Sequence, residues 1–296
     1  MMTSAASLGM VAGKRTLAQR VVSKLGTTVV NVVLAIVAIF WLVPSVGLFL
    51  TSLRSSGDNA SSGWWTIFTA PAQLTIENYS KLLQNDAITG SIWNTIVITV
   101  PATLLVVILG SMAGYAFAWM DFPGRDWLLI VVVVLLAVPL QVAIIPLARL
   151  FGAIGIFGSV VGVILFHTAF GLPFAIFLLR NFFTQIPGEL IEAARIDGAG
   201  EWRIFFTVMM PLAMPSIASL AIFQFLWTWN DMLVALIFTN SGSQPLTVAI
   251  QSQLRQYGSN IDVLSAGAFL SMIVPLIVFF AFQRYFVQAM LAGSQK

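Results

Sequence analysis

The sequence predicts an all-α polytopic membrane protein with six transmembrane helices. Of its 296 residues, 59% are hydrophobic and only 8% are charged, and the mean hydropathy is +0.95. Soluble domains have about 25% charged residues, so this composition indicates helices that face lipid. The absence of cysteine excludes a disulfide framework and a thiol-ligated metal centre. The net charge of +3 is too small and too dispersed to indicate a nucleic-acid partner.

Six apolar stretches are long enough to cross the hydrocarbon core, which takes about 20 helical residues. They cover residues 29–50, 92–119, 127–149, 158–180, 209–238 and 264–286. We expect the second and the fifth to tilt or bend, because they exceed that length. The first follows basic residues, as in a signal peptide, but no small-residue cleavage pattern follows Pro44. We therefore expect it to remain as a membrane anchor.

The distribution of Lys and Arg predicts how the spans are oriented. Six spans place both termini on one side of the membrane. With the N-terminus inside, ten of the 14 basic residues lie inside and four lie outside, which satisfies the positive-inside rule. We therefore expect a cytoplasmic N-terminal segment (1–28), a six-helix domain (29–286) and a cytoplasmic tail (287–296). In the first segment, Leu17, Val21 and Leu25 recur at helical spacing among basic residues, which predicts a helix on the inner membrane surface.

Three longer segments lie outside the spans. The external segment 54–91 includes a predicted helix from Glu77 to Leu83, and a second external loop covers residues 239–264. The internal loop 181–210 contains the most informative pattern, described next.

A short polar helix is predicted inside that internal loop. Pro187-Gly188 interrupts the extension of the fourth span, and Glu189 and Glu192 then lie near a helix start, where carboxylates suit the positive end of the dipole. Gly198 is predicted to end the helix in the left-handed conformation. Two interpretations stay open on physical grounds. The helix packs on its own bundle, or it is a plug that fits a soluble partner.

These residues resemble the EAA signature of permease subunits of ATP-binding-cassette importers. The signature is E-A-A, three residues, glycine, nine residues, isoleucine, one residue, leucine-proline. The chain has Glu192-Ala193-Ala194, Gly198 and Pro211 at the matching positions, with Val208 for the isoleucine and Met210 for the leucine. Further stretches resemble the MalG-like branch of carbohydrate permeases, which shares the MetI-like permease fold. They are Glu77-Asn78-Tyr79, Trp227-Thr228-Trp229-Asn230-Asp231, Pro245-Leu246-Thr247 and Gln283-Arg284-Tyr285-Phe286.

The resemblance implies partners and a mechanism. It implies a second, MalF-like permease subunit, two cytoplasmic ATPase subunits, an extracytoplasmic sugar-binding protein and a place among the lipids of a bacterial cytoplasmic (inner) membrane. Mg-ATP would be bound by the ATPase subunits and no cofactor by this chain, whose Gly9–Lys14 stretch lacks the spacing and the Ser or Thr of a phosphate-binding loop. The implied ATPase-coupling residues are Glu189, Glu192, Ala193, Ala194, Arg195, Asp197, Gly198 and Pro211. The implied binding-protein loop includes Gln244, Pro245, Leu246, Thr247 and Gln251.

Two ionisable residues inside predicted spans suggest further roles. Asp231 is the only acid in a span, and such carboxylates are usually functional. With Trp227, Trp229 and Asn230 it is a candidate for the substrate path, although it also suits a helix end that is wet or packed. His167, the only histidine, is either a packing residue or a proton relay. An ion-coupled secondary transporter that uses Asp231 and His167 is therefore the alternative function. A membrane enzyme is disfavoured, because no cluster of catalytic polar residues is present.

Overall fold

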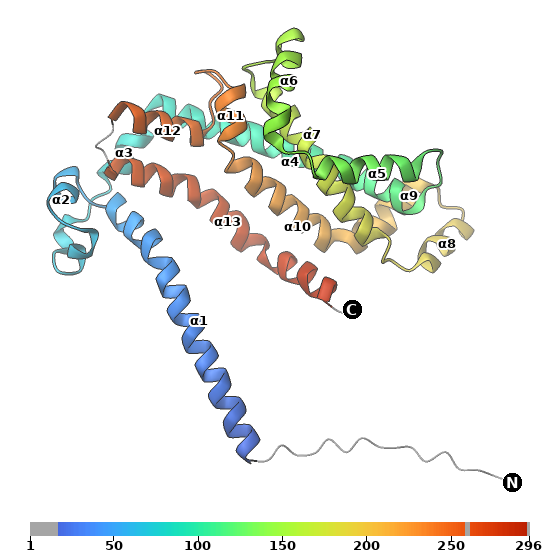
Figure 1. Cartoon of the computed structure of the whole chain (residues 1–296), viewed down its shortest axis with the longest axis horizontal. Coiled ribbons are helices and arrows are strands. Elements are labelled where there is room, and N and C mark those ends of the chain that lie inside the picture. The colour runs from blue at the N-terminus through green and yellow to red at the C-terminus, as the bar shows by residue number, and fades with distance from the viewer. Residues whose placement is uncertain (1–16, 258–260, 295–296) are drawn as a thin grey trace.

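The computed structural model describes the backbone of residues 17–257 and 261–294, and within these the side chains of residues 26, 28–252 and 262–284. This part of the chain is helical, with one isolated antiparallel bridge between Arg54 and Leu74 (Figure 1). Its long helices are α1 (Leu17–Ser52), α4 (Asp86–Trp119), α5 (Arg125–Leu136), α6 (Leu140–Ala153), α7 (Val160–Phe183), α10 (Met210–Trp229) and α13 (Ile261–Ser294). Its shorter helices are α2 (Ser56–Ser61), α3 (Glu77–Leu83), α8 (Gly188–Ile196), α9 (Glu201–Ile204), α11 (Leu233–Phe238) and α12 (Leu246–Tyr257).

Five helices are long and apolar enough to cross a membrane, and one bent pair occupies the place of the predicted third span. The bent pair is α5 and α6, whose axes differ in direction by 104°. The predicted span over residues 127–149 is therefore formed by two helices with a sharp bend between them. Pro139 precedes α6, and a proline disfavours the helical conformation in the residue before it and donates no backbone hydrogen bond.

The predicted fifth span, residues 209–238, also ends early. α10 stops at Trp229, and α11 begins a new helix at Leu233. The carboxylate of Asp231 accepts hydrogen bonds from the backbone N–H groups of Val234 and Ala235 at 3.4 and 3.0 Å. This contact satisfies free N–H groups of the first turn, as a helix cap does, and so favours a restart over continuation.

Small residues allow α4 and α7 to pack closely. A Cβ atom added to Gly110 of α4 would lie 2.6 Å from the Cβ of Ala175 in α7. A Cβ added to Gly114 would lie 3.1 Å from the backbone nitrogen of Arg180. Helices in membranes associate through such small-residue contacts. α10 packs on both helices, whereas most of α1 is exposed and extends away from the bundle (Figure 1).

The external segment after α1 is organised around a buried arginine. The guanidinium of Arg54 is fully buried and donates hydrogen bonds to Gln73, Asn59, Ser62 and Thr66 side chains and to the carbonyls of Asp58 and Ser62. The predicted helix at Glu77–Leu83 is confirmed as α3. The segment is therefore a folded cap at the outer end of α1, with two 3₁₀ turns, η1 (Trp64–Phe68) and η2 (Pro71–Gln73).

The first and last helices extend beyond the predicted spans, and the predicted membrane boundaries at residues 28 and 286 stay predictions. α1 is continuous from Leu17, so its helix starts before residue 29, and α13 continues to Ser294, past residue 286. The predicted surface face of Leu17, Val21 and Leu25 concerns side chains outside the described set, and residues 1–16 lie outside it altogether.

Candidate functional site

The loop over residues 181–210 contains α8, which begins and ends as the sequence predicts. Pro187 precedes the first turn and Glu189 lies within it. Gly198 follows the helix with a φ of +77°, a left-handed conformation that glycine adopts without strain. The predicted helix and its left-handed glycine are confirmed.

α8 has one buried face and one exposed face. Ile191 is 1% exposed and belongs to the core cluster that includes Phe183 and Ile204. The exposed residues of α8 are Glu189, Leu190, Glu192, Ala193, Arg195 and Ile196. Neither carboxylate of this face forms an ion pair within the described part of the chain. α8 therefore exposes the carboxylates of Glu189 and Glu192 and the small side chain of Ala193 on the face that points away from the bundle.

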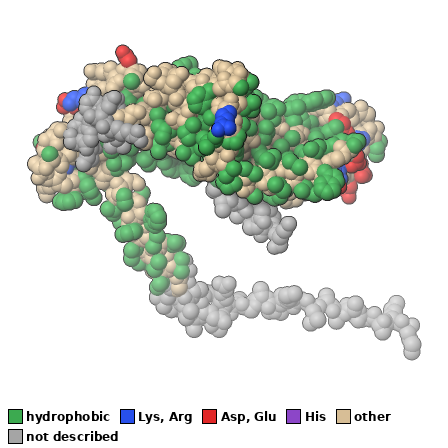
Figure 2. All heavy atoms as spheres, turned by 45° about the horizontal axis from the view of Figure 1, so that its top comes forward, with side chains coloured by type: hydrophobic (Ala, Val, Ile, Leu, Met, Phe, Trp, Pro, Cys, Tyr) green, Lys and Arg blue, Asp and Glu red, His purple; other side chains and the backbone are tan. Residues whose placement is uncertain are grey.

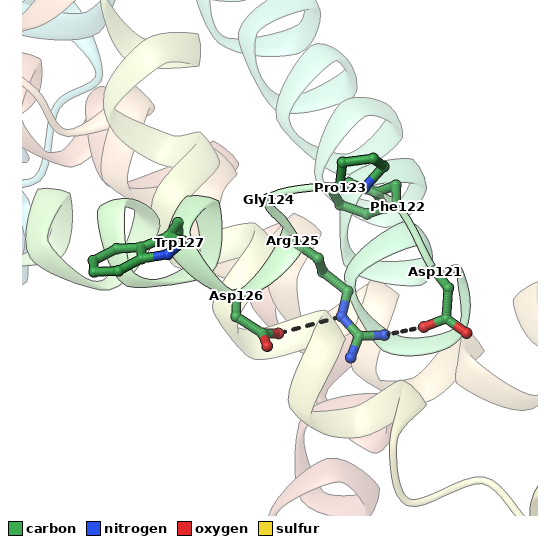
Figure 3. A pocket seen from close by; sticks show the side chains of 7 residues that line it. All are labelled: Asp121, Phe122, Pro123, Gly124, Arg125, Asp126 and Trp127. Atoms are coloured by element: carbon green, nitrogen blue, oxygen red, sulfur yellow. Dashed lines mark hydrogen bonds and ion pairs between the residues drawn. The ribbon is translucent and has the colours of Figure 1, made fainter.

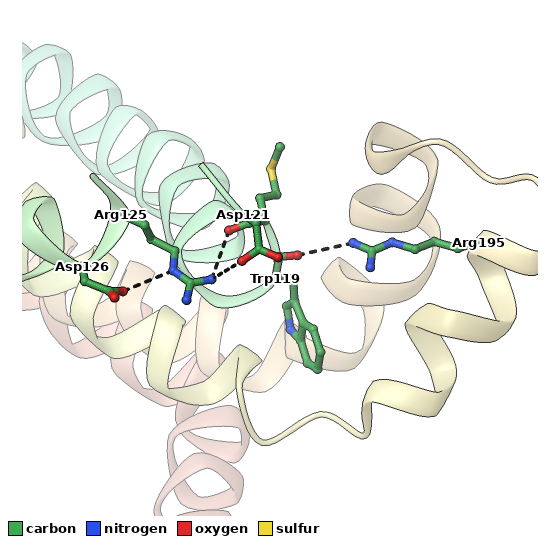
Figure 4. Close-up of polar contacts among 6 residues, drawn as sticks. Trp119, Asp121, Arg125, Asp126 and Arg195 are labelled. Atoms are coloured by element: carbon green, nitrogen blue, oxygen red, sulfur yellow. Dashed lines mark hydrogen bonds and ion pairs between the residues drawn. The ribbon is translucent and has the colours of Figure 1, made fainter. Parts of the chain in front are cut away.

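Arg195 has a different environment from the one predicted. Its Nη2 and Nε atoms donate to Oε1 of Glu201 at 2.9 and 3.1 Å, and Nη2 also donates to the carbonyl of Trp119 at 3.3 Å. Tyr115 donates its hydroxyl to Oε2 of the same glutamate at 2.5 Å. Arg195 therefore binds its own bundle (Figure 4), and Glu201 and Tyr115 are site residues that the sequence did not reveal.

The remaining residues predicted for coupling lie around α8 and after it. Ala194 is partly buried against the inner core cluster, and Asp197 is exposed. Pro211 is near the start of α10, directly after a π-helical turn, η3 (Phe205–Met209). Proline has no N–H to continue the α-helical ladder, which gives a physical reason for a wider turn there.

A charged turn lies beside α8 at the same end of the molecule. In residues 121–127, Arg125 lies between Asp121 and Asp126, with nitrogen–oxygen distances of 2.9 and 3.4 Å (Figure 3). The turn encloses an open hollow of about 490 Å³. Acidic and basic side chains gather at this end, and apolar side chains cover most of the body between the ends (Figure 2).

At the other end of the bundle, His167 and Asp231 come together. The Nε2 atom of His167 lies 3.5 Å from Oδ2 of Asp231, and the two side chains are 1% and 11% exposed. The ring of Trp227 contacts the imidazole edge-on, with centroids 5.2 Å apart. His167 Nδ1 is buried and has no hydrogen-bond partner in the described part of the chain. The pair is therefore a local contact between α7 and the break that separates α10 from α11.

The structure separates the four residues predicted for the substrate path. Trp227 is 37% exposed, whereas Trp229 is 2% exposed and donates its indole N–H to the carbonyl of Ser271. Asn230 is exposed, and its amide donates to the carbonyl of Leu226. In this conformation Trp229 is a packing residue against α13, so the prediction that it faces a substrate is not supported.

Trp227 lines a cavity that the sequence did not reveal. The cavity has a volume of about 340 Å³ and lies between the α5–α6 bend, α7 and α10. Its polar wall is the amide of Gln224, which is 4% exposed and donates to Oγ1 of Thr228 at 3.1 Å. The other lining residues are Leu135, Leu136, Val138, Leu140, Phe170, Gly171, Phe174 and Phe223. Because they come from three separate segments, no local pattern marks them in the sequence.

The outer loop predicted to meet a binding protein is held against the bundle. Pro245 and Leu246 are buried, and the backbone N–H of Leu246 donates to Oγ1 of Thr95 at 2.8 Å. Thr247 donates its hydroxyl to the carbonyl of Asp231. Gln244, Thr247 and Gln251 are half-buried. Pro245 and Leu246 therefore position the loop, and they present no surface of their own.

Comparison with known proteins identifies the family. The model of the binding-protein-dependent transport system inner membrane component matches residues 106–292. The chain belongs to this family. The permease is 47% identical over 272 residues to the osmoprotective compounds uptake permease protein GgtD of Synechocystis sp., a match that covers 90% of this chain and 91% of the relative.

Another relative and a solved structure are consistent with this family assignment. The permease is 46% identical over 263 residues to the alpha-glucoside transport system permease protein AglG of Rhizobium meliloti, with 86% of this chain and 69% of the relative covered. A chain of a bacterial ABC transporter involved in the import of the acidic polysaccharide alginate matches with a TM-score of 0.76 at 23% identity, over 92% of this permease and 99% of that chain. The predicted permease fold is confirmed. The family is one of transport components rather than enzymes, and the described residues contain no group of three metal-ligating side chains.

Proposed function

We propose that this permease is the transmembrane subunit of an ATP-driven carbohydrate importer of the bacterial cytoplasmic membrane, and that it forms the translocation path with a second, MalF-like permease subunit. The observation that carries the proposal is the exposed acidic face of α8 on a family member whose relatives include permeases of alpha-glucosides and osmoprotective compounds.

In this proposal α8 is a coupling helix. Two cytoplasmic ATPase subunits bind Mg-ATP, and Glu189, Glu192 and Ala193 contact a cleft on one of them. Residues 1–28 and 287–296 lie in the cytoplasm with α8. An exposed ion pair contributes only about 0–1 kcal/mol, so Glu192 matters through burial in that cleft. Coupling requires that the docked helix favour different ATPase states unequally.

An extracytoplasmic sugar-binding protein meets the opposite end of the bundle. The half-buried Gln244, Thr247 and Gln251 and the folded segment around Arg54 supply polar groups there. Because Leu246 is tied to Thr95, a force on this loop reaches α4 directly.

The substrate path includes the cavity beside Trp227. Indole and phenyl rings stack on sugar rings, and the amide of Gln224 supplies hydrogen bonds to hydroxyl groups. Asp231 caps α11 and Asn230 is exposed nearby, so these two lie at the outer entrance rather than in the cavity.

The test is transport in proteoliposomes with maltose and trehalose as probes. The complex purified from its native membrane, with its binding protein, is expected to take up sugar only with ATP. In Glu192→Ala we expect sugar-stimulated ATPase activity to fall at least tenfold while the subunit still assembles. Asp126→Asn, an exposed acid at the same end of the molecule but outside α8, is the matched control and is expected to keep normal activity.

Transport measurements in the same proteoliposomes distinguish the proposed ATP-driven importer from an ion-coupled secondary transporter. Uptake by this chain alone, driven by a proton or sodium gradient without ATP, would show an ion-coupled transporter. Normal coupling in Glu192→Ala would remove α8 from the mechanism.

A further inference from the structure

The contacts of Arg195 join three elements that are far apart in the sequence. Arg195 ends α8, Glu201 begins α9, and Tyr115 and Trp119 belong to the last turns of α4. The carboxylate of Glu201 accepts from Arg195 through one oxygen and from Tyr115 through the other. Trp119 in turn donates its indole N–H to the carbonyl of Phe183 at the end of α7, at 3.0 Å. A chain of hydrogen bonds therefore runs from α8 to the two helices that pack most closely.

The backbone on either side of α8 is well suited to bending. Pro187 is the residue before α8, Gly188 is its first residue, and Gly198 and Gly200 follow it. Because glycine restricts the backbone least, the segments next to α8 do little by themselves to fix its orientation relative to the bundle. Besides the packing of Ile191 and Ala194 on the core cluster, the side chain of Arg195 gives α8 polar contacts to Glu201 and to the carbonyl of Trp119, and these contacts help to fix its direction.

We infer that Arg195, Glu201 and Tyr115 form a clamp that makes α8 and the inner end of α4 move together, so that a displacement of α8 is converted into a displacement of the bundle. The inference rests on the proposed coupling function of α8. The three are positioning residues: they hold the helix, whereas Glu192 makes the contact with the ATPase.

The chemistry of the contact distinguishes it from an ordinary surface ion pair. Arg195 and Glu201 are 43% and 38% exposed, and an isolated pair of that kind stabilises little. Here the carboxylate accepts three charge-assisted hydrogen bonds, and the phenol that donates one of them is 4% exposed. Such networks are stronger and more directional than single pairs. The clamp therefore fixes the orientation of α8 relative to α4, and its contribution to the stability of the folded protein is small.

The functional test measures sugar molecules imported per ATP hydrolysed, in the full complex with maltose as the probe. Tyr115→Phe removes one hydroxyl from the network, and Glu201→Gln removes its charge. We expect the ratio to fall at least threefold in both, with ATP hydrolysis retained. Arg203→Gln is the matched control, because Arg203 is an exposed base on α9 whose side chain forms no hydrogen bond or ion pair with the described residues, and its ratio is expected to stay normal.

The positional test measures the distance between spin labels. The chain contains no cysteine, so Ile196→Cys and Asp121→Cys introduce two unique labelling sites, one on α8 and one after α4. We expect a narrow distance distribution that broadens in Tyr115→Phe and Glu201→Gln. The charge exchange Arg195→Glu with Glu201→Arg should recover part of the narrow population that each single reversal loses.

The outcomes separate the inference from the proposed function. An unchanged ratio and an unchanged distribution in both variants would overturn the clamp while α8 still couples. If the wild-type complex itself fails to link ATP hydrolysis to uptake, the proposed function is wrong, and the spin-label distances still decide whether the clamp orients α8.

Discussion

Gly198 shows how one residue fixes the geometry of the turn after α8. Its φ of +77° is disfavoured for every side chain that branches at Cβ. Space is not the constraint, because an added Cβ would meet nothing within 4 Å. Any effect of substitution therefore comes from the backbone.

We predict that Gly198→Val destabilises this turn by about 1–2 kcal/mol and reduces sugar-stimulated ATPase activity. Gly200→Ala is the control, because Gly200 has a φ of −73° and also has open space around it. The measurement is ATPase activity of the reconstituted complex with and without sugar. Equal activity in both variants would show that the left-handed turn has no part in coupling.

Of the four residues predicted for the substrate path, Trp227 lines the cavity between the α5–α6 bend, α7 and α10. It is partly exposed, whereas Trp229 is buried against α13. We predict that Trp227→Ala lowers the rate of maltose import at least fivefold at a fixed binding-protein concentration, with basal ATPase activity unchanged. Trp227→Phe keeps a stacking ring and is expected to lose less.

A matched control for this prediction is Trp93→Ala, since Trp93 is 65% exposed near the outer start of α4 and lines none of the cavities described. If Trp93→Ala and Trp227→Ala lose import equally, the effect reflects loss of an interfacial ring rather than contact with sugar.

At the scale of elements, the external segment depends on Arg54. Its guanidinium supplies six hydrogen bonds inside a loop whose two 3₁₀ turns bury few apolar side chains. Replacing it leaves several buried acceptors without donors, at about 1–3 kcal/mol each where no water enters.

We therefore predict that Arg54→Met unfolds residues 54–76 locally while the bundle stays folded. Limited chymotrypsin digestion of the purified complex checks this, because Trp64 and Phe68 lie in the segment. Lys81→Met is the control, since it removes only an exposed ion pair with Glu77. Equal resistance of Arg54→Met and the wild type would contradict the role of the arginine.

The sequence predicted elements better than it predicted their breaks and contacts. Apolar length identified the spans, and proline and glycine identified the limits of α8, because these signals are local. The bend at Pro139 was missed, since the valines and leucines before it continue the apolar run without interruption. The break after Trp229 depends on the cap by Asp231, which the alternative of a helix-end residue had left open.

The site residues also differ in whether a local sequence signal reveals them. The acidic face of α8 follows from helical spacing. Tyr115 and Glu201, by contrast, are 86 residues apart in the chain, and no periodicity connects them. Gln224 looks like an isolated polar residue until the fold places it on a cavity wall. Tertiary packing, rather than local propensity, decides these cases.

At the scale of the whole molecule, the contact between α4 and α7 sets what can move. We predict that Gly110→Ala lowers the thermal stability of the purified complex, because its Cβ would overlap Ala175 and overpacking costs about 1–3 kcal/mol. Gly90→Ala lies in the same helix with open space around it and is expected to be neutral or stabilising. Thermal unfolding in detergent, followed for both variants, checks the prediction, and equal melting temperatures would contradict it.

The close packing of α4 against α7 has a consequence for transport. Because the backbones of α4 and α7 are in close contact at Gly110 and Gly114, we expect the two helices to move together as one rigid body. We therefore expect the movements of transport at the breaks in the helices instead: the 104° bend at Pro139, the interruption between α10 and α11, and the π-helical turn before Pro211. Two of these three breaks border the Trp227 cavity or follow that tryptophan within a few residues, which places the moving parts beside the proposed sugar path.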